Sequence, residues 1–210
     1  MCIIVAKKDV QRKILDACIN LSYGQMDGSL FIAERGAASG YYKYGVTLYH
    51  KGHRKLSVLN SYDLLTIKKL ASIDGAVIVA RDGSLKAYAA TLTYSKRIIG
   101  HGKRHAFAAG TTARNPMLIA ILASEEDRHI RIFENGITIF DIDSRTRIPV
   151  RTKDRVIELL LNKTSLTIIA GAIATSVLVL NPLPAIVTIA GSQVLVAEGF
   201  ERLKKFFNGS

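Results

Sequence analysis

The sequence has few of the residues that mark disulfide-bonded, metal-bound or secreted proteins. Its 210 residues include two cysteines and no tryptophan, and Cys2 and Cys18 form no CxxC pair. Nothing among the first thirty residues reads as a charged, apolar and small-residue secretion signal. The five histidines form no HExxH motif and no Cys/His cluster, so a structural zinc site has little support. These absences favour a reducing, cytoplasmic compartment.

Acidic residues are also scarce beside basic ones. There are 17 Asp and Glu against 29 Lys and Arg, which gives a net charge of +12. A hydrophobic fraction of 49% excludes a disordered tail, a collagen-like fibre and a polar low-complexity segment. The charge favours an anionic partner, which can be a nucleotide, a nucleic acid or an acidic lipid surface. Most of the excess lies in residues 1–147, whose 22 basic and 13 acidic residues leave +9.

The first half of the chain alternates helical and strand-like patterns. Apolar residues from Val10 to Leu21 recur at helical spacing and predict an amphipathic helix. Residues 28–33 read as a short buried strand, and Gly36–Tyr44 as the loop that follows it. A second helix is expected over Leu64–Ala71 and a strand over 76–80.

Two turns predict β-hairpins. Asp82-Gly83 lies between residues 76–80 and 85–91, and Asn135-Gly136 lies between 130–133 and 137–140. Both dipeptides supply the positive φ that tight hairpin turns need. We therefore expect two antiparallel strand pairs.

The remaining patterns complete an α/β fold. The apolar run Met117–Ala123 suits a strand buried on both faces, and a helix is expected to begin near Ala106, after a basic tetrapeptide. Strands interleaved with helices and hairpins imply a mixed central sheet with helices packed on it. We assign residues 1–147 to this domain.

The character of the chain changes after residue 147. A basic amphipathic linker helix is expected within 148–164, and residues 165–197 carry no charge and are broken only by Asn181-Pro182-Leu183-Pro184. The two halves are short for the roughly twenty residues that cross a bilayer, so they predict an apolar helical hairpin. A basic tail, 198–210, follows.

Basic residues flank this hairpin on both sides, the distribution expected at a cytoplasmic membrane face. We expect residues 165–197 to anchor the protein to the membrane from that side. The alternative is a pair of core helices packed on the domain or on a second copy of the chain.

Three polar segments lie beside apolar strands, where α/β domains place their sites: Asp74-Gly75-Ala76, Gly102–His105 and Ser124-Glu125-Glu126. If they converge, the site holds cations for phosphate, carboxylates for a divalent metal and a glycine that lets backbone approach a ligand. That composition suits phosphoryl or nucleotidyl transfer.

Each segment also has a structural reading. Asp-Gly is a common turn dipeptide, and the basic stretch 96–105 can be a solvated face or a nonspecific nucleic-acid patch. Residues 125–127 can be a polar turn. Gly102-Lys103 is not a P-loop, because Arg104 replaces the hydroxyl residue that would hold Mg²⁺.

As an ordered set, these segments resemble the diadenylate cyclase (DAC) domain over about residues 5–145. The resemblance rests on Ile73–Val79, Gly102–Gly110, Ile119–Glu126 and the hairpin that closes at Asp141. It implies condensation of two ATP molecules into cyclic di-AMP, a second messenger, with release of two pyrophosphates. It also implies a divalent metal, Mn²⁺ or Mg²⁺, and a homodimer whose two sites face each other. No specific nucleic acid is expected as a partner.

The resemblance also assigns roles to residues. It implies catalytic roles for Asp74, Arg104 and His105 and metal binding by Asp74 and Glu125. The nucleotide-binding positions it implies are Gly75, Ala76, Leu92, Gly102, Lys103, Arg104, His105 and Ser124.

The chain departs from the family's Gly-Thr-Arg-His-Arg loop at two positions. Lys103 stands at the threonine and Ala106 at the second arginine. Lysine is a point charge without the planar fork of arginine, so it restores charge without restoring geometry. Two alternatives to the cyclase follow: a catalytically impaired nucleotide or dinucleotide sensor, and a basic, membrane-attached adaptor.

Overall fold

The structure is a computed structural model that describes residues 2–25, 27–47, 55–146 and 149–161. Met1–Asn162 form one compact unit, and the other unit, Lys163–Ser210, lies outside the described residues. In chain order the elements are α1 (Cys2–Ser22), β1 (Ser29–Glu34), β2 (Tyr42–Val46), α2 (Ser61–Ala71), β3 (Ala76–Val79), β4 (Leu85–Leu92), α3 (Lys103–Arg114), β5 (Leu118–Ala123), β6 (His129–Glu134), β7 (Ile137–Asp143) and α4 (Val150–Leu161).

The seven strands form one mixed sheet in the order β2-β4-β3-β1-β5-β6-β7. β1 and β3 are parallel, and the other neighbouring strands are antiparallel. The predicted mixed α/β architecture is therefore confirmed for the described residues.

Both predicted hairpins are present. β3 pairs with β4, and β6 pairs with β7. Asn135 and Gly136 have φ values of 51° and 78°, and Gly83 has 84°. Positive φ at both central residues matches the right-handed twist of the flanking strands, which is why Asn-Gly predicts a hairpin correctly here.

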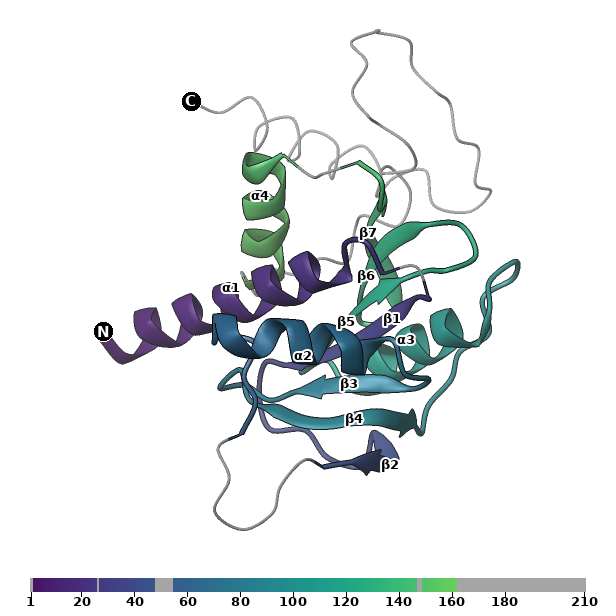
Figure 1. Cartoon of the computed structure of the whole chain (residues 1–210), viewed down its shortest axis with the longest axis horizontal. Coiled ribbons are helices and arrows are strands. Elements are labelled where there is room, and N and C mark those ends of the chain that lie inside the picture. Colours follow the sequence, from purple (N-terminus) through teal and green to yellow (C-terminus); the bar gives the residue numbers. More distant parts are fainter. Residues whose placement is uncertain (1, 26, 48–54, 147–148, 162–210) are drawn as a thin grey trace, which may run out of the picture. The chain divides into compact units, whose positions relative to one another are not determined.

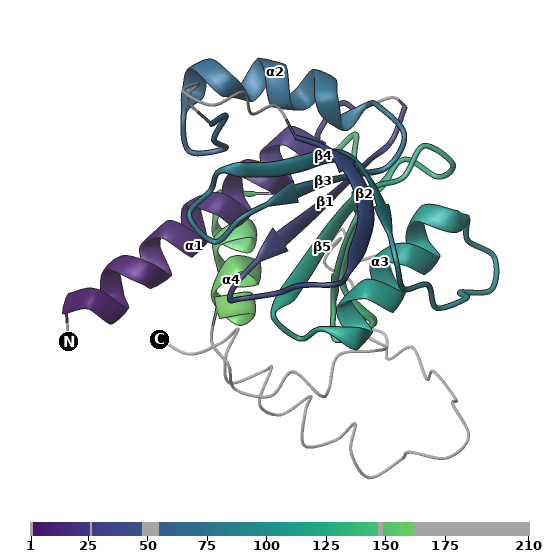
Figure 2. The same cartoon turned by 90° about the horizontal axis from the view of Figure 1, so that it is seen from below.

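Helices cover both faces of the sheet (Figures 1 and 2). Successive strand residues point to opposite faces, so β1 and β5 each contribute to two separate apolar clusters. Phe31 and Ile121 pack with residues of α1, α2 and α4 on one face, whereas Ile32 and Leu122 pack with α3 on the other. β5 is buried along its whole length, as its unbroken apolar run predicts.

The loop expected over Gly36–Tyr44 is shorter than predicted, because the edge strand β2 begins at Tyr42. Four of the five β2 residues are exposed, so the segment lacks the alternation of buried apolar and exposed polar residues that predicts a strand. Its pairing with β4 is irregular, with two register shifts. This strand forms because its backbone hydrogen-bonds to the edge of the sheet. Such bonding leaves little signal in the amino-acid composition.

The helix expected to begin near Ala106 begins three residues earlier, at Lys103, with Gly102 as its N-cap. The basic residues 103–105 are therefore the first turn of α3 and not a loop before it. Gly102 has no side chain to cap the helix, so the usual sequence signal for a helix start is missing.

α4 is the basic helix expected within 148–164, and it packs against α1. Ile157 and Leu160 are buried, and Arg12 pairs with Glu158 at 3.1 Å. Arg35 also donates to the Leu160 carbonyl at 2.7 Å. α4 therefore belongs to the same unit as the sheet.

The apolar hairpin 165–197 and the basic tail 198–210 lie outside the described residues. Within the described part of the chain, none of the helices combines the length and the apolar character that crossing a bilayer requires.

Candidate nucleotide-binding site

Strand order brings the three polar segments together at one end of the central strands. Ser29 pairs with Ala123, so the start of β1 lies beside the end of β5. β3 runs parallel to β1, which places Asp74, just before β3, at the same end of the strands. Ser124 directly follows β5 there. The convergence depends on β5 running antiparallel to β1, which chain order alone does not reveal.

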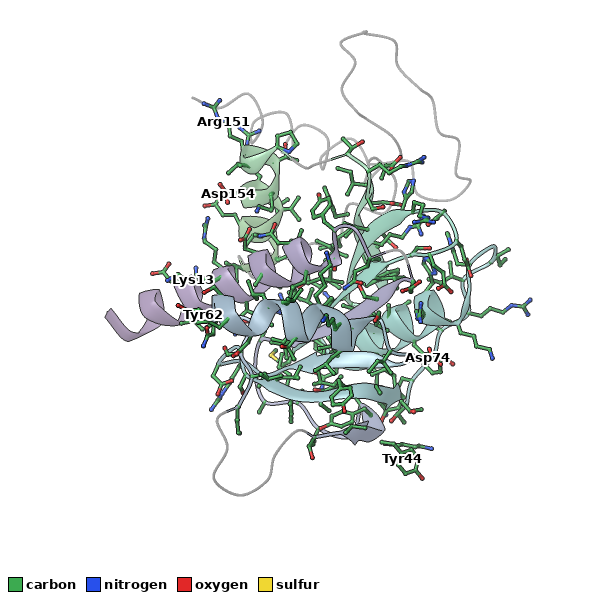
Figure 3. The ribbon with its side chains drawn as sticks, viewed as in Figure 1. Lys13, Tyr44, Tyr62, Asp74, Arg151 and Asp154 are labelled. Carbon is green, nitrogen blue, oxygen red and sulfur yellow. The ribbon has the colours of Figure 1, made fainter. Side chains whose placement is uncertain are left out.

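Arg104 contacts all three loops at this end of the strands. Its Nη1 donates to the Asp27 carbonyl at 2.9 Å and to Glu125 Oε2 at 3.3 Å. Its Nη2 donates to Asp74 Oδ1 at 3.4 Å. The Asp74 side chain is 98% exposed at the surface (Figure 3), whereas that of Arg104 is 24% exposed. The guanidinium is thus held by one normal hydrogen bond to backbone and by two longer, solvent-accessible ion pairs that a stronger anion can replace.

An open cavity of about 270 Å³ surrounds this cluster. Seven of the ten residues predicted for the site line it: Asp74, Gly102, Lys103, Arg104, His105, Ser124 and Glu125. Leu122 and Glu126 complete the lining.

The other three predicted residues, Gly75, Ala76 and Leu92, do not line this cavity. Ala76 and Leu92 are buried in the apolar cluster on the α3 face of the sheet. Their side chains therefore shape the core beside the site, and any contact with a nucleotide would come from their backbone.

Glycines allow the close approaches on which the site depends. Gly28 has φ of +72°, and a Cβ there would lie 2.5 Å from Arg104 Nη1 and 3.1 Å from the Ala123 carbonyl. Gly75 has φ of +110°, and a Cβ there would lie 2.6 Å from the Ala89 backbone. Both positions exclude ordinary side chains by conformation and by space. Gly28 thus lets the Arg104 guanidinium lie directly over the backbone.

His105 points into the protein, unlike its neighbours in the first turn of α3. It is buried, and its Nε2 lies 2.6 Å from Arg131 Nη1 on β6. Its ring stacks on His101 and meets Phe133 edge-on. Burial, followed by the positive charge of Arg131, lowers the pKa of His105 to about 4. His105 is therefore neutral at physiological pH.

Arg131 is itself held by carboxylates. Its Nε donates to Asp141 at 2.8 Å, and its Nη2 donates to Asp127. Burial alone would raise the pKa of Asp127, but the hydrogen bond and the charge of Arg131 lower it on balance. Asp141 also contacts His129 at 2.5 Å, so the cluster behind the site is a network of linked polar and charged side chains.

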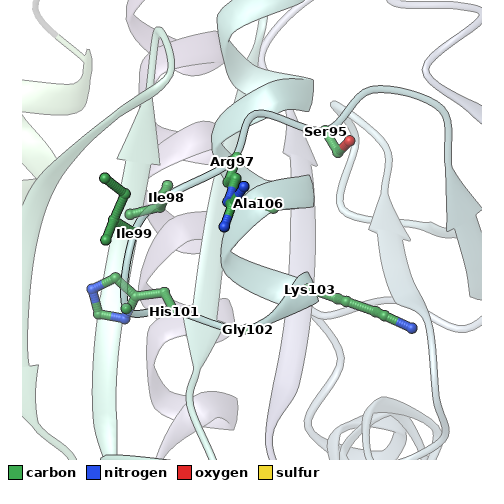
Figure 4. Close-up of a pocket in the computed structure, with 9 residues that line it drawn as sticks. Ser95, Arg97, Ile98, Ile99, His101, Gly102, Lys103 and Ala106 are labelled. Carbon is green, nitrogen blue, oxygen red and sulfur yellow. The ribbon is translucent and has the colours of Figure 1, made fainter.

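A second hollow of about 320 Å³ lies beside Ala106, between α3 and the preceding loop (Figure 4). It shares Gly102 and Lys103 with the site cavity, and Arg97 and His101 also line it. The open space occurs at the position where the resemblance expects a second arginine.

The donor set at the site suits a divalent metal that is held partly by its substrate. Magnesium commonly uses one or two carboxylates together with substrate phosphates. Asp74 and Glu125 supply two hard oxygen ligands, and Arg104 holds both side chains at one cavity. Among the described residues, no group of three His, Cys, Asp or Glu side chains is placed to bind a metal ion. The residues present therefore fit a metal that phosphate oxygens help to bind.

Sequence reasoning missed the residues that support the site from behind. Asp27 contributes a backbone carbonyl, which leaves no signature in residue type. Asp127 belongs to the segment 125–127, which can be read as a polar turn, and Arg131 lies within the strand expected over 130–133. The one available signal was Arg131 inside the strand pattern Ile130-Arg-Ile-Phe, a cation amid apolar neighbours.

Comparisons with known proteins point to one family. The family model DAC, described as "DisA bacterial checkpoint controller nucleotide-binding", matches residues 16–138. A diadenylate cyclase of Methanocaldococcus jannaschii is 34% identical over 86 residues, which cover 40% of this chain and 28% of that protein. The chain thus matches little more than a quarter of that relative's length.

Two solved structures are also similar to the chain. DacA from Staphylococcus aureus, crystallised as a double cysteine mutant, has a TM-score of 0.49 at 18% identity, with 73% of this chain and 96% of that chain covered. A hypothetical membrane spanning protein from Bacillus cereus has a TM-score of 0.38 at 21% identity, with 60% of each chain covered. The family assignment rests on the family model, whose match over residues 16–138 covers more than half of the 210 residues. The chain belongs to the DAC family.

Proposed function

We propose that this protein is a diadenylate cyclase that condenses two ATP molecules into cyclic di-AMP and two pyrophosphates. The observation that carries the proposal is the arrangement around Arg104, which gathers Asp74 and Glu125 at one cavity with Lys103. Membership of the DAC family supplies the class of reaction.

The cations of the first turn of α3 bind the triphosphate. Arg104 presents a planar fork to phosphate oxygens, and Lys103 adds a second positive charge at the cavity. The N-terminal end of α3 adds the favourable dipole and free backbone N–H groups. Charge developing on the α-phosphate is thereby neutralised as pyrophosphate leaves.

Asp74 orients the attacking 3′-hydroxyl and takes its proton. In each of two displacements an O3′–P bond forms, the bond from the α-phosphorus to the bridging oxygen breaks, and pyrophosphate carries away the electron pair. Asp74 suits this role because its carboxylate is exposed at the cavity, where it accepts from Arg104 and from the Gly75 N–H. When bound at Asp74 and Glu125, a divalent metal would neutralise charge on the reacting phosphate.

The chemistry requires two copies of the chain. Each site presents one ATP, so ring closure needs a second site facing the first. The site cavity is open to solvent at the ends of the central strands, which suits such an encounter. We expect a homodimer at least during turnover, and specific activity should therefore rise with protein concentration.

We also propose that residues 165–197 attach the protein to the cytoplasmic face of the membrane. A chain ending at residue 161 is the appropriate comparison, because α4 packs on α1. Full-length protein should float with liposomes of neutral and anionic lipid, and the shorter chain should not. Equal recovery of both in the soluble fraction would favour helices packed on the protein instead.

The decisive experiment incubates the full-length chain with ATP and Mn²⁺ or Mg²⁺ and measures cyclic di-AMP by mass spectrometry at several protein concentrations. Asp74→Ala should abolish product while leaving the melting temperature unchanged, since this side chain is almost fully exposed. Asp82→Ala is a matched control, because Asp82 is another Asp-Gly turn residue and does not line the cavity.

The other outcomes identify the alternatives. Saturable binding of ATP or cyclic di-AMP without product would point to a sensor and to Ala106 as the missing phosphate contact. Binding to polyanions that falls steeply with salt, without competition from ATP, would point to a basic adaptor.

A further inference from the structure

Arg131 is a buried cation behind the site cavity. It is 7% exposed, lies on β6 and does not line the cavity. Burying a guanidinium is unfavourable unless its charge and its donors are matched. Asp127 and Asp141 match the charge, and a further contact goes to His105. The His105 contact engages a third nitrogen of the guanidinium and links Arg131 on β6 to α3.

The contact fixes the chemical state of His105. Arginine has only donors, so His105 Nε2 must accept, and the proton of the neutral ring must be on Nδ1. The groups around the ring are His101, Phe133, Arg131 and, more distantly, Asp127 and Asp141. In this state Nε2 is occupied and takes no proton from substrate.

His105 in turn fixes the first turn of α3. Gly102 provides no side-chain cap, so the end of the helix lacks its usual local anchor. Strand β6 is hydrogen-bonded on both sides, by β5 and β7, and so offers a rigid support. The Arg131–His105 contact links this support to the residue directly after Arg104.

We propose that Arg131 is a positioning residue that acts through His105 to hold Arg104 in the orientation that receives the triphosphate. This inference rests on the proposed function for its kinetic consequence. The structural part, the Nδ1-protonated His105 held by Arg131, stands independently of any activity.

The kinetic test compares Arg131→Met with Arg131→Lys in the full-length chain. Small displacements of a substrate-binding group are costly, so Arg131→Met should lower product formation at saturating ATP by about 10- to 100-fold. Arg131→Lys, which retains the charge but places its donors on a single nitrogen, should recover part of this loss. Arg145→Met is the matched control, because Arg145 pairs with Asp143 on the same sheet, is exposed and lies away from the cavity. It should leave the rate unchanged.

Histidine ¹⁵N NMR of the same full-length chain tests the contact directly, with the His105 signal assigned by His105→Gln. In the wild type His105 should be the Nδ1-protonated tautomer and remain neutral from pH 8 to pH 5. In Arg131→Met the pKa of His105 should rise, because Asp127 and Asp141 then face it without the competing cation, while burial still opposes protonation. If the single variant unfolds, the double variant Arg131→Met/Asp141→Asn serves in its place, because it also removes the charge of one carboxylate that Arg131 contacts.

The outcomes separate this inference from the proposed function. Wild-type His105 protonated on Nε2, or an Arg131→Met protein with unchanged rate and unchanged His105 signal, would overturn the inference. If the wild type makes no cyclic di-AMP, the proposed function fails, and the NMR arm together with the ATP dissociation constant of Arg131→Met still decides the role of Arg131.

Discussion

Two arginines on the same side of the molecule are held in opposite ways. Arg104 makes ion pairs of 3.3 and 3.4 Å with exposed carboxylates. Arg131 is buried and contacts two carboxylates and a histidine at 2.8 Å or less. Long, hydrated pairs are weak and can be exchanged for a ligand, whereas desolvated, saturated contacts cannot. The difference suits Arg104 to binding the substrate and Arg131 to holding the site in place.

Replacing Arg104 should cause the largest change in activity. Arg104→Met should lower cyclic di-AMP formation by at least about a hundredfold, the scale typical of losing one transition-state donor. The melting temperature should change little, because the lost pairs are solvent-accessible. Rates from mass spectrometry and a thermal melt of the same samples would check both expectations. A variant with near wild-type rates would remove Arg104 from the reaction.

Replacing Arg131 should cause the largest change in stability. Arg131→Met removes the buried cation from Asp127 and Asp141, whose side chains are 37% and 29% exposed, and leaves Asp141 its contact with His129. Breaking a fully buried pair costs about 3–5 kcal/mol, so the loss here should be about 3 kcal/mol or less. Arg104→Met should cost about 1 kcal/mol or less. Urea unfolding of both variants measures the two free energies of unfolding. Similar values for the pair would contradict the contrast drawn between the clusters.

The protonation of His105 should give a smaller effect that depends on pH. The unfolded chain binds a proton at this ring near pH 6.5, and the folded chain only near pH 4. The unfolded state thus binds more protons between these values, so stability falls as pH drops from about 6.5 to 4. His105→Gln should lose this slope, which is at most about 1.4 kcal/mol per pH unit. Urea midpoints measured at pH 7, 6 and 5 would check it, and an unchanged slope would count against a buried, neutral His105.

Local signals predicted much of the fold. The Asn-Gly and Asp-Gly turns, the apolar run of β5 and the spacing in α1 each reflect short-range chemistry, and each matched an observed element. The edge strand β2 and the true start of α3 were missed for different reasons. An exposed edge strand is determined by backbone hydrogen bonds to a partner distant in sequence, which composition does not record. A helix with a glycine N-cap lacks the capping side chain that usually marks its start.

The sequence by itself determined the family, the residue types of the site and the basic character of its loop, because these depend on which side chains follow which. Tertiary structure decided which of them meet. The pairing of β1 with β5 brings Asp74, Arg104 and Glu125 to one cavity. The pairing of β4 with β2 and β3 leaves Leu92 in the core, and the pairing of β6 with β5 places Arg131 where His105 contacts it. Contacts between residues far apart along the chain depend on strand order and register, and those are set by burial of the whole sheet and not by any local pattern.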